Sequence, residues 1–165
     1  KLVLMTAGGA KAKAQCHNGA ITCAAFNTEA STLITGGYDM LVKTWNYDSL
    51  TAHAHFIPLH SLSFSSTVMC VCYVPATRSV WVGTQGCSTP HVFDPRTGTN
   101  LTDFLPHSDT RSASAPGDSP VRIIAGETGE AVTVSEHKTL CIWRYNPLAC
   151  VSIIRGHTDW VEMVL

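Results

Sequence analysis

The sequence predicts an all-β fold made of short strands. Runs rich in Val, Ile, Thr and aromatic residues recur along the 165-residue chain, and turns containing Gly, Pro, Asn or Asp separate them. No segment keeps the apolar spacing of an amphipathic helix over several turns, so we expect no long helix. The predicted strands are AITCAAF (20–26), STLITGG (31–37), MLVKTWNY (40–47), TVMCVCYV (67–74), RSVWVGT (78–84), HVFD (91–94), VRIIAG (121–126), EAVTVS (130–135), TLCIWRY (139–145) and ACVSIIR (149–155).

These strands repeat as groups. In each group an apolar strand, a turn and a second strand lead to a third strand that ends in an aromatic residue. The aromatic residues are Trp45, Phe93 and Trp143, which are 48 and 50 residues apart. That period is slightly above the ~40–45 residues of a four-stranded propeller blade. The clearest fourth strand follows Trp143, at residues 149–155.

Composition excludes several classes of protein. Hydrophobic residues make up 45% of the chain, enough for a real core, while charged residues make up 14% and the formal net charge is -1. Because no basic block is visible, we expect no direct nucleic-acid binding through phosphates. No apolar run approaches the ~20 residues of a membrane-spanning helix. The first residues, KLVLMTAGGA, contain neither an initiator Met nor a signal-peptide core, so we expect a fragment of a longer chain.

Seven cysteines are expected to be reduced thiols. Several occur in alternating apolar strands, where a free cysteine behaves as a small hydrophobic residue. Their spacing fits neither a zinc site nor a disulfide framework. An odd number of such thiols suits a reducing compartment, so we expect a cytoplasmic protein. The cysteines are Cys16, Cys23, Cys70, Cys72, Cys87, Cys141 and Cys150.

Three motifs carry a family resemblance. LITGGYDMLVKTWN (33–46) follows a Gly/Asp turn with an alternating strand that ends on Trp, while GHTDWV (156–161) and HNGAI (17–21) place a His four residues before an apolar residue. In these features the chain resembles the WD-repeat β-propeller family. The match is uneven, because Phe64 replaces the His of the second unit, Gly86 stands at its Asp position, and His137 replaces the Asp of the third unit.

The resemblance implies a partial β-propeller. We expect about three four-stranded antiparallel blades and the first strand of another, in a fragment of a larger propeller. The remaining blades would come from the same or another chain, because repeat units need neighbours to be stable. The implied blades cover approximately residues 16–62, 63–105 and 119–156, the next blade starts at 157–165, and 106–120 forms a flexible insert.

The resemblance also implies a structural tetrad in the first blade. His17, Thr35, Asp39 and Trp45 are expected to form a hydrogen-bond chain that satisfies polar groups inside the sheet. The same residue types invite a second interpretation, a hydrolytic triad with Thr35 as the nucleophile. A nucleophile needs an exposed hydroxyl and a pocket. We therefore favour the structural interpretation and expect no catalytic residues.

Two other segments contain candidate sites. His53, His55 and His60 lie close together, but no Cys, Asp or Glu nearby completes a zinc site, so a surface loop is expected. The insert PHSDTRSASAPGDSP (106–120) is too polar to bury a core. It is either a plain flexible loop or a regulated segment in which Ser112 or Ser114 accepts phosphate. We expect no metal and no cofactor.

The family resemblance implies a non-catalytic protein–protein interaction scaffold within a eukaryotic multiprotein assembly, with no membrane contact. The alternative is a regulatory WD-repeat module of a larger protein whose catalytic domain lies outside this segment. Insertions gather on the face that bears the His and Asp turns, which is therefore the expected binding face. The candidate partner contacts on it are Tyr38, Gln85, Glu136, His137 and Trp160.

Overall fold

The computed structural model describes residues 2–5, 11–48, 57–101, 119–135, 138–145, 149–159 and 161. Nearly all of its regular elements are strands, and η1 (Pro75–Thr77) is a short 3-10 helix. None of the helices in these residues is long and apolar enough to cross a membrane. The strands are β1 (Leu2–Met5), β2 (Lys11–Ala14), β3 (Ile21–Asn27), β4 (Thr32–Gly37), β5 (Leu41–Asn46), β6 (His60–Ser63), β7 (Val68–Val74), β8 (Ser79–Thr84), β9 (His91–Phe93), β10 (Pro120–Ala125), β11 (Glu130–Ser135), β12 (Thr139–Arg144) and β13 (Ala149–Arg155).

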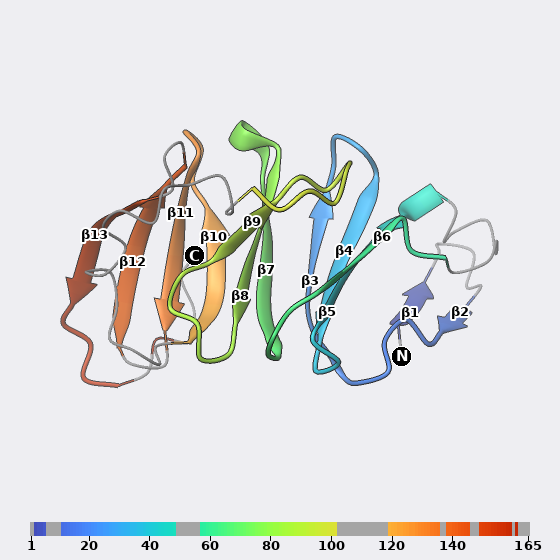
Figure 1. Ribbon diagram of the computed structural model, residues 1–165, viewed down its shortest axis with the longest axis horizontal. Coiled ribbons are helices and arrows are strands. Elements are labelled where there is room, and N and C mark those ends of the chain that lie inside the picture. Colours follow the sequence, from blue (N-terminus) through green and yellow to red (C-terminus); the bar gives the residue numbers. More distant parts are fainter. Residues whose placement is uncertain are drawn as a thin grey trace.

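Three antiparallel sheets follow one another along the chain. Blade 1 has the strand order β3-β4-β5-β6, blade 2 has β7-β8-β9, and blade 3 has β10-β11-β12-β13. Their first strands adjoin, because β7 packs against β3 on one side and β10 on the other (Figure 1). Consecutive meander sheets that meet along their first strands form a partial β-propeller, as the sequence predicts.

A fourth segment of blade 2 begins beside β9. The Leu101 amide donates to the Val92 carbonyl at 2.7 Å, and the Asp94 amide donates to the Thr99 carbonyl at 3.0 Å. Phe93 and Asn100 form an isolated bridge between these two hydrogen bonds. The chain therefore turns back along β9 before it enters residues 102–118, which lie outside the described residues and include most of the predicted flexible insert 106–120. The last two residues of that predicted insert are described: Ser119 is buried and Pro120 begins β10, so the prediction was wrong for these two residues.

Two strands differ from the sequence expectation. His60 was expected in a surface loop, but it begins β6 and pairs with Thr44. That expectation was wrong because HSLS is an edge strand with a half-polar pattern, which gives little periodic signal. The hairpin of β1 and β2, in which Leu2 pairs with Ala14, was not predicted at all.

The first strand of every blade is irregular at the same place. In each blade the register shifts by one residue directly after the first cross-strand pair. Such a bulge bends the strand and strengthens its local twist. The three shifts lie between Ile21 and Cys23, between Val68 and Cys70, and between Pro120 and Arg122.

The bulges bring neighbouring blades into polar contact. The Thr22 hydroxyl donates to the Val68 carbonyl of blade 2 at 2.6 Å. The Cys70 thiol lies 3.4 Å from the Pro120 carbonyl of blade 3. Val68 and Pro120 are the first residues of their strands, so equivalent carbonyls are used at both junctions.

The hydrophobic core lies between the blades. One cluster joins blades 1 and 2 and is made of Ile34, Val42, Val68, Val71, Tyr73, Val80, Val82 and Phe93. A second cluster joins blades 2 and 3 and is made of Cys70, Val74, Trp81, Val92, Ile123, Ala131, Cys141 and Trp143. Blade 2 therefore buries both of its faces.

Glycine permits the close approach of the blades. Gly36 and Gly83 occupy equivalent positions, opposite Cys23 and Cys70. A Cβ atom at Gly36 would lie 2.4 Å from Val68 Cγ1, and one at Gly83 would lie 2.8 Å from Pro120 Cγ. In blade 3 the equivalent position is Val134, opposite Arg122.

We expect Gly36→Ala and Gly83→Ala each to lower the free energy of unfolding by ~1–3 kcal/mol, because a methyl group there overpacks the junction. Chemical denaturation monitored by Trp fluorescence measures the loss. Gly156→Ala is the matched control, because nothing lies within 4 Å of a Cβ at that residue. Equal losses for all three variants would contradict the glycine contacts.

Candidate functional site

A continuous chain of hydrogen bonds crosses blade 1. His17 Nδ1 lies 2.8 Å from Asp39 Oδ1 and 3.1 Å from Oδ2. His17 Nε2 lies 2.8 Å from the Thr35 Oγ1 atom. Trp45 Nε1 donates to the same oxygen at 2.9 Å. The structure thus brings together all four residues of the predicted tetrad.

One protonation pattern satisfies every member of the chain. With a proton on Nδ1, the imidazole donates to the Asp39 carboxylate and keeps an acceptor at Nε2. The Thr35 hydroxyl donates to that nitrogen and accepts from Trp45. Each group thereby has its partner, as buried polar groups require.

The strand register explains the arrangement. Thr35 on β4 pairs with Lys43, and Leu33 pairs with Trp45, so the Thr35 and Trp45 side chains share one face of blade 1. His17 lies four residues before β3 and packs over that face. Thr35 is 0% and Trp45 is 1% exposed. This buried hydrogen-bond network, called the brace below, therefore connects the segment before β3 to the two central strands, β4 and β5.

The Asp39 turn joins β4 to β5. Asp39 Oδ2 also accepts the Asn18 amide at 2.9 Å, and the Tyr38 amide donates to the Ala20 carbonyl at 2.9 Å. A Cβ at Gly19 would lie only 3.0 Å from Tyr38 Cβ. The segment before β3 therefore lies directly against the turn and holds it on one side.

The electrostatics favour an ionised Asp39. Burial raises the pKa of this carboxyl group, but the hydrogen bonds from His17 and Asn18 outweigh burial and lower it overall. The side chain is 8% exposed. A buried carboxylate of this kind is stable because several donors surround it.

The hydrolytic interpretation does not fit this geometry. A nucleophile must present its oxygen to a substrate. Thr35 is fully buried, and its oxygen is already bonded to both His17 and Trp45.

Lys43 is a member of the site that sequence reasoning missed. Its Nζ donates to the Cys16 carbonyl at 2.7 Å and lies 5.9 Å from the Trp45 ring centroid. The ammonium thus ties the segment before His17 to β5 through a hydrogen bond and a cation–π contact. Its position two residues before Trp45 is the signal that could have identified it.

Of the expected partner contacts, Tyr38 and Gln85 lie in the described residues and the others do not. Tyr38 is 59% exposed at the Asp39 turn, beside Met40, which is 44% exposed. Gln85 is exposed at the end of β8, where its carbonyl accepts the Ser66 hydroxyl at 2.6 Å. Glu136, His137 and Trp160 lie outside the described residues.

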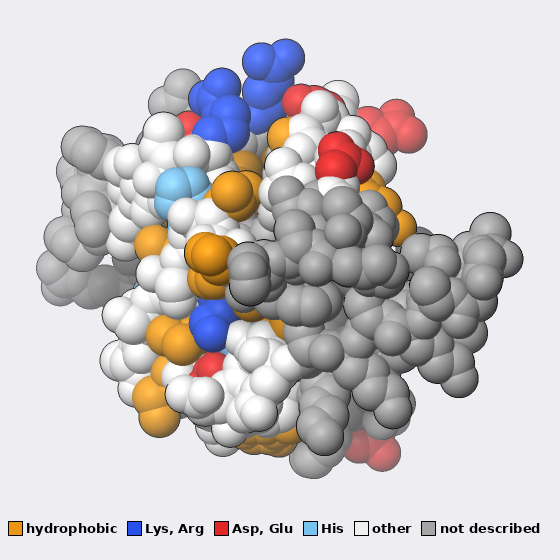
Figure 2. Space-filling model, turned by 90° about the vertical axis from the view of Figure 1, so that its right-hand side faces the viewer, with side chains coloured by type: hydrophobic (Ala, Val, Ile, Leu, Met, Phe, Trp, Pro, Cys, Tyr) orange, Lys and Arg blue, Asp and Glu red, His pale blue; other side chains and the backbone are white. Residues whose placement is uncertain are grey.

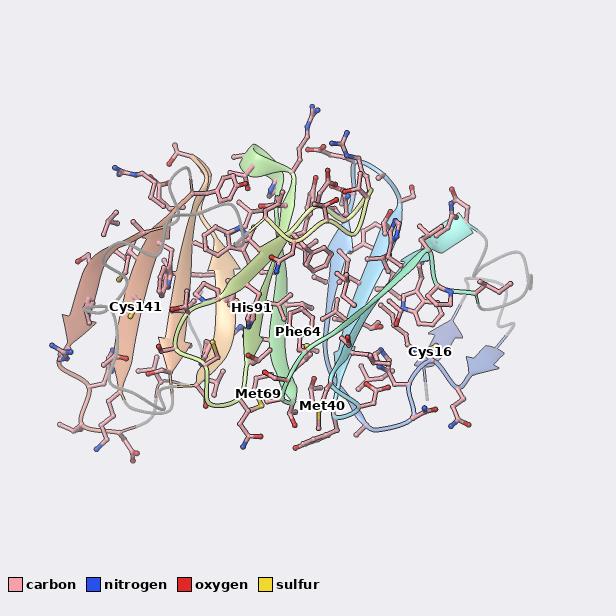
Figure 3. All side chains as sticks on the ribbon, viewed as in Figure 1. Cys16, Met40, Phe64, Met69, His91 and Cys141 are labelled. Atoms are coloured by element: carbon pink, nitrogen blue, oxygen red, sulfur yellow. The ribbon has the colours of Figure 1, made fainter. Side chains whose placement is uncertain are left out.

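Figures 2 and 3 show where the apolar side chains lie. Hydrophobic side chains are exposed in several places on the blade 1 end of the molecule (Figure 2). Met40 and Met69 lie toward the same edge of the molecule, the lower edge in Figure 3. Sequence reasoning missed Met40 because methionine also fills cores, and only its place in the turn marks it as exposed.

Blade 2 replaces the whole tetrad with apolar residues. Val82 pairs with His91, and Val80 with Phe93, so Val82 stands where Thr35 stands in blade 1 and Phe93 stands for Trp45. Phe64 occupies the His position, four residues before β7, and packs on the cluster between blades 1 and 2. Gly86 takes the place of Asp39. No polar group is therefore left needing a partner.

Blade 3 keeps part of the tetrad. Trp143 Nε1 donates to Thr133 Oγ1 at 2.9 Å, and both residues have the register of their blade 1 counterparts. His137, at the Asp position, lies outside the described residues. The Trp-to-hydroxyl bond is thus the part of the brace that blades 1 and 3 share.

All seven cysteines are described, and all are thiols. Within the described residues, no group of three or more His, Cys, Asp or Glu side chains could hold a metal ion. His60 Nε2 bonds the Arg96 carbonyl at 2.9 Å, whereas His53 and His55 lie outside those residues.

Comparison with known proteins agrees with this geometry. The family model "WD domain, G-beta repeat" matches residues 10–46, the segment that contains the complete tetrad. The chain therefore contains a segment similar to a WD repeat, in keeping with its partial β-propeller fold.

Curated relatives match most of this chain at low identity. Nuclear distribution protein PAC1 of Fusarium vanettenii is 24% identical over 97% of the chain and 35% of its own length. PAC1 of Coccidioides posadasii is 28% identical over 91% of the chain and 31% of its own length. Nuclear distribution protein nudF 1 of Talaromyces marneffei is 23% identical over 91% of the chain and 30% of its own length. The chain spans about a third of the length of these relatives.

We expect Asp39→Ala to lower the free energy of unfolding by ~1–3 kcal/mol, because it leaves the Nδ1–H group of buried His17 without its acceptor. A double-mutant cycle with His17→Ala, followed by urea denaturation, measures the coupling. The two losses should be strongly non-additive, since the residues act as a pair. Simple additivity would contradict the brace.

The stability that Asp39 contributes should depend on pH. The pKa of this carboxyl group is lower in the folded chain than its ordinary value of 3.8, so the contribution is complete above that value and is lost as pH falls through the folded pKa. The difference in unfolding free energy between the wild type and Asp39→Ala should therefore shrink between about pH 5 and about pH 2. A difference that stays constant over this range would contradict the ionised brace.

Proposed function

We propose that this chain is a non-catalytic protein–protein interaction scaffold within a multiprotein assembly, and that the Asp39 turn is one of its contact points. The observation that carries the proposal is the pair of exposed side chains Tyr38 and Met40 on either side of Asp39. Asp39 itself is held by His17 and Asn18. An aromatic anchor on a fixed turn loses little conformational freedom on binding.

The same turns on other blades extend the proposed surface. Gln85 directly follows β8 in blade 2, as the Asp39 turn follows β4 in blade 1. Glu136 and His137 take the corresponding turn of blade 3, and Trp160 follows the next Gly-His motif. We propose that these residues contact proteins of the same assembly. The remaining blades would come from the same or another chain.

Composition supports a protein partner rather than a nucleic acid or a membrane. The formal net charge is -1 with 14% charged residues, which gives no phosphate-binding footprint. The seven thiols suit the reducing cytoplasm, where we propose that the protein acts. Because the chain spans about a third of the matched relatives at 23–28% identity, the proposal concerns the WD-repeat domain rather than the process in which those relatives act.

We expect the double variant Tyr38→Ala, Met40→Ala to bind at least one associated protein about tenfold more weakly, a loss of about 1.4 kcal/mol in binding free energy. The measurement is affinity purification of the tagged intact protein, with quantitative mass spectrometry of everything that copurifies. Thermal unfolding of the same variant checks that blade 1 stays folded.

The matched control is Val151→Ser, Ile154→Ser, which changes two comparably exposed apolar residues on β13, 47% and 48% exposed. This control should retain the proteins that the turn variant loses. If the turn variant retains every associated protein while the β13 variant loses them, the contacts lie on the rim of the propeller and the assigned face is wrong.

A further inference from the structure

A small pocket lies where the end turns of blades 1 and 2 meet. Asn27 and Glu29 line it from blade 1, and Tyr73, Arg78 and Arg96 line it from blade 2. Its volume is about 260 Å³, below the ~300–1,000 Å³ of pockets that enclose drug-sized ligands. The pocket therefore suits one side-chain group rather than a whole small molecule.

This pocket is remote from the Asp39 turn. The turn between β3 and β4, helix η1 and the turn after β9 all lie along the upper edge of the molecule in Figure 1. Met40 lies toward the lower edge in the same view (Figure 3). A ligand in this pocket would therefore bind apart from the contact surface proposed above, on the opposite face of the blades.

Arg78 is presented by an unusual backbone conformation. The residue directly before the second strand of each blade has a positive φ, which is 46 at Ser31, 50 at Arg78 and 99 at Gly129. Glycine adopts this left-handed conformation at the lowest cost. An arginine in this position carries some backbone strain, in keeping with a role for its side chain.

Arg96 is fixed by the turn after β9. Its amide donates to Asp94 Oδ1 at 2.8 Å, and its Nη2 donates to Asp94 Oδ2 at 3.2 Å. His60 Nε2 lies 2.9 Å from its carbonyl oxygen. Asp94 occupies only one edge of the planar guanidinium, and the side chain is 67% exposed. The other N–H groups of Arg96 are therefore available to a second oxyanion.

Glu29 brings a carboxylate to the same pocket. Its Oε2 atom lies 3.5 Å from Arg78 Nε, and the side chains of Glu29 and Arg78 are 45% and 70% exposed. An ion pair with this much exposure contributes little to stability, so it opens at little cost. The carboxylate of Glu29 thus marks a place where Arg78 holds an oxyanion and from which a stronger one can displace it.

Two neutral donors complete the pocket. Tyr73 is buried, and burial and the nearby Glu29 carboxylate raise the pKa of its hydroxyl group, which stays protonated. Asn27 is also buried, and its Oδ1 accepts the amides of Glu29 at 3.0 Å and Ala30 at 3.3 Å. The Nδ2 group of Asn27 is therefore left to donate.

We propose that this pocket binds a phosphate monoester, the phosphorylated serine or threonine side chain of a partner protein. Such a group carries a charge of about −1.5 to −2 at pH 7 and three strong acceptor oxygens, which arginine binds through paired N–H groups. A carboxylate ligand would only exchange with the carboxylate of Glu29, whereas a phosphate gains charge and an acceptor in that exchange. The net charge of -1 favours a single phosphate group over a polyanion.

The test titrates three acetylated and amidated tripeptides into the intact protein, with glycine on either side of phosphoserine, serine or aspartate. Saturation-transfer NMR of the peptides measures their dissociation constants. The phosphoserine peptide should bind at least about tenfold more tightly than the other two. Equal binding of the serine or the aspartate peptide would overturn the proposal. Inorganic phosphate should bind no more tightly than the phosphoserine peptide, and clearly tighter binding would assign the pocket to the free ion and overturn the protein source.

Three variants locate the binding of the phosphoserine peptide. Arg78→Gln should weaken it by about tenfold or more, whereas Glu29→Gln should strengthen it by about threefold or more because the competing carboxylate is gone. Arg144→Gln is the matched control, because Arg144 is 64% exposed and pairs with Glu130 in blade 3, and it should change nothing. All of these arginine and Glu29 side chains lie at the surface, so the variants should stay folded, which thermal unfolding checks. Equal effects of Arg78→Gln and Arg144→Gln, or weaker binding by Glu29→Gln, would contradict the site.

Discussion

The Thr35 hydroxyl is the point on which blade 1 depends. It is fully buried, it lies 2.8 Å from His17 Nε2, and it accepts the indole N–H of Trp45 at 2.9 Å. Through His17 the same chain reaches the carboxylate of Asp39. An unpaired member would cost ~1–3 kcal/mol, so the four positions specify one another. The exposed Asp39 turn is therefore part of the interior network rather than a loose loop.

Blades 1 and 2 meet the same packing requirement in two ways. Blade 1 uses a closed polar chain, whereas blade 2 carries Phe64, Val82, Gly86 and Phe93 at the equivalent positions. Replacing every partner in a network with apolar groups leaves nothing unsatisfied, which is far less costly than removing one partner. Blade 2 has blade 1 on one face and blade 3 on the other, so its apolar version also completes the core between sheets.

Much of this could be predicted from the sequence. The alternating strands and the spacing of Trp45, Phe93 and Trp143 predicted the repeated sheets, and the motifs at 17–21 and 33–46 predicted the members of the tetrad. His60 was misplaced because an edge strand with polar residues has little periodicity. The cross-strand register shows that Val82 in blade 2 corresponds to Thr35 in blade 1. The turn between β8 and β9 is longer than the turn between β4 and β5, so this correspondence could not be read from the sequence alone.

The central claim is that Asp39 holds Trp45 through His17 and Thr35. Hydrogen exchange of the Trp indole N–H groups, followed by NMR in the wild type and in Asp39→Ala, tests it most directly. Trp143 is an internal reference, because its N–H bonds Thr133 in blade 3. The account predicts that loss of Asp39 speeds exchange at Trp45 by about tenfold or more while Trp143 changes little. Unchanged exchange at Trp45, or equal acceleration at both indoles, would contradict it.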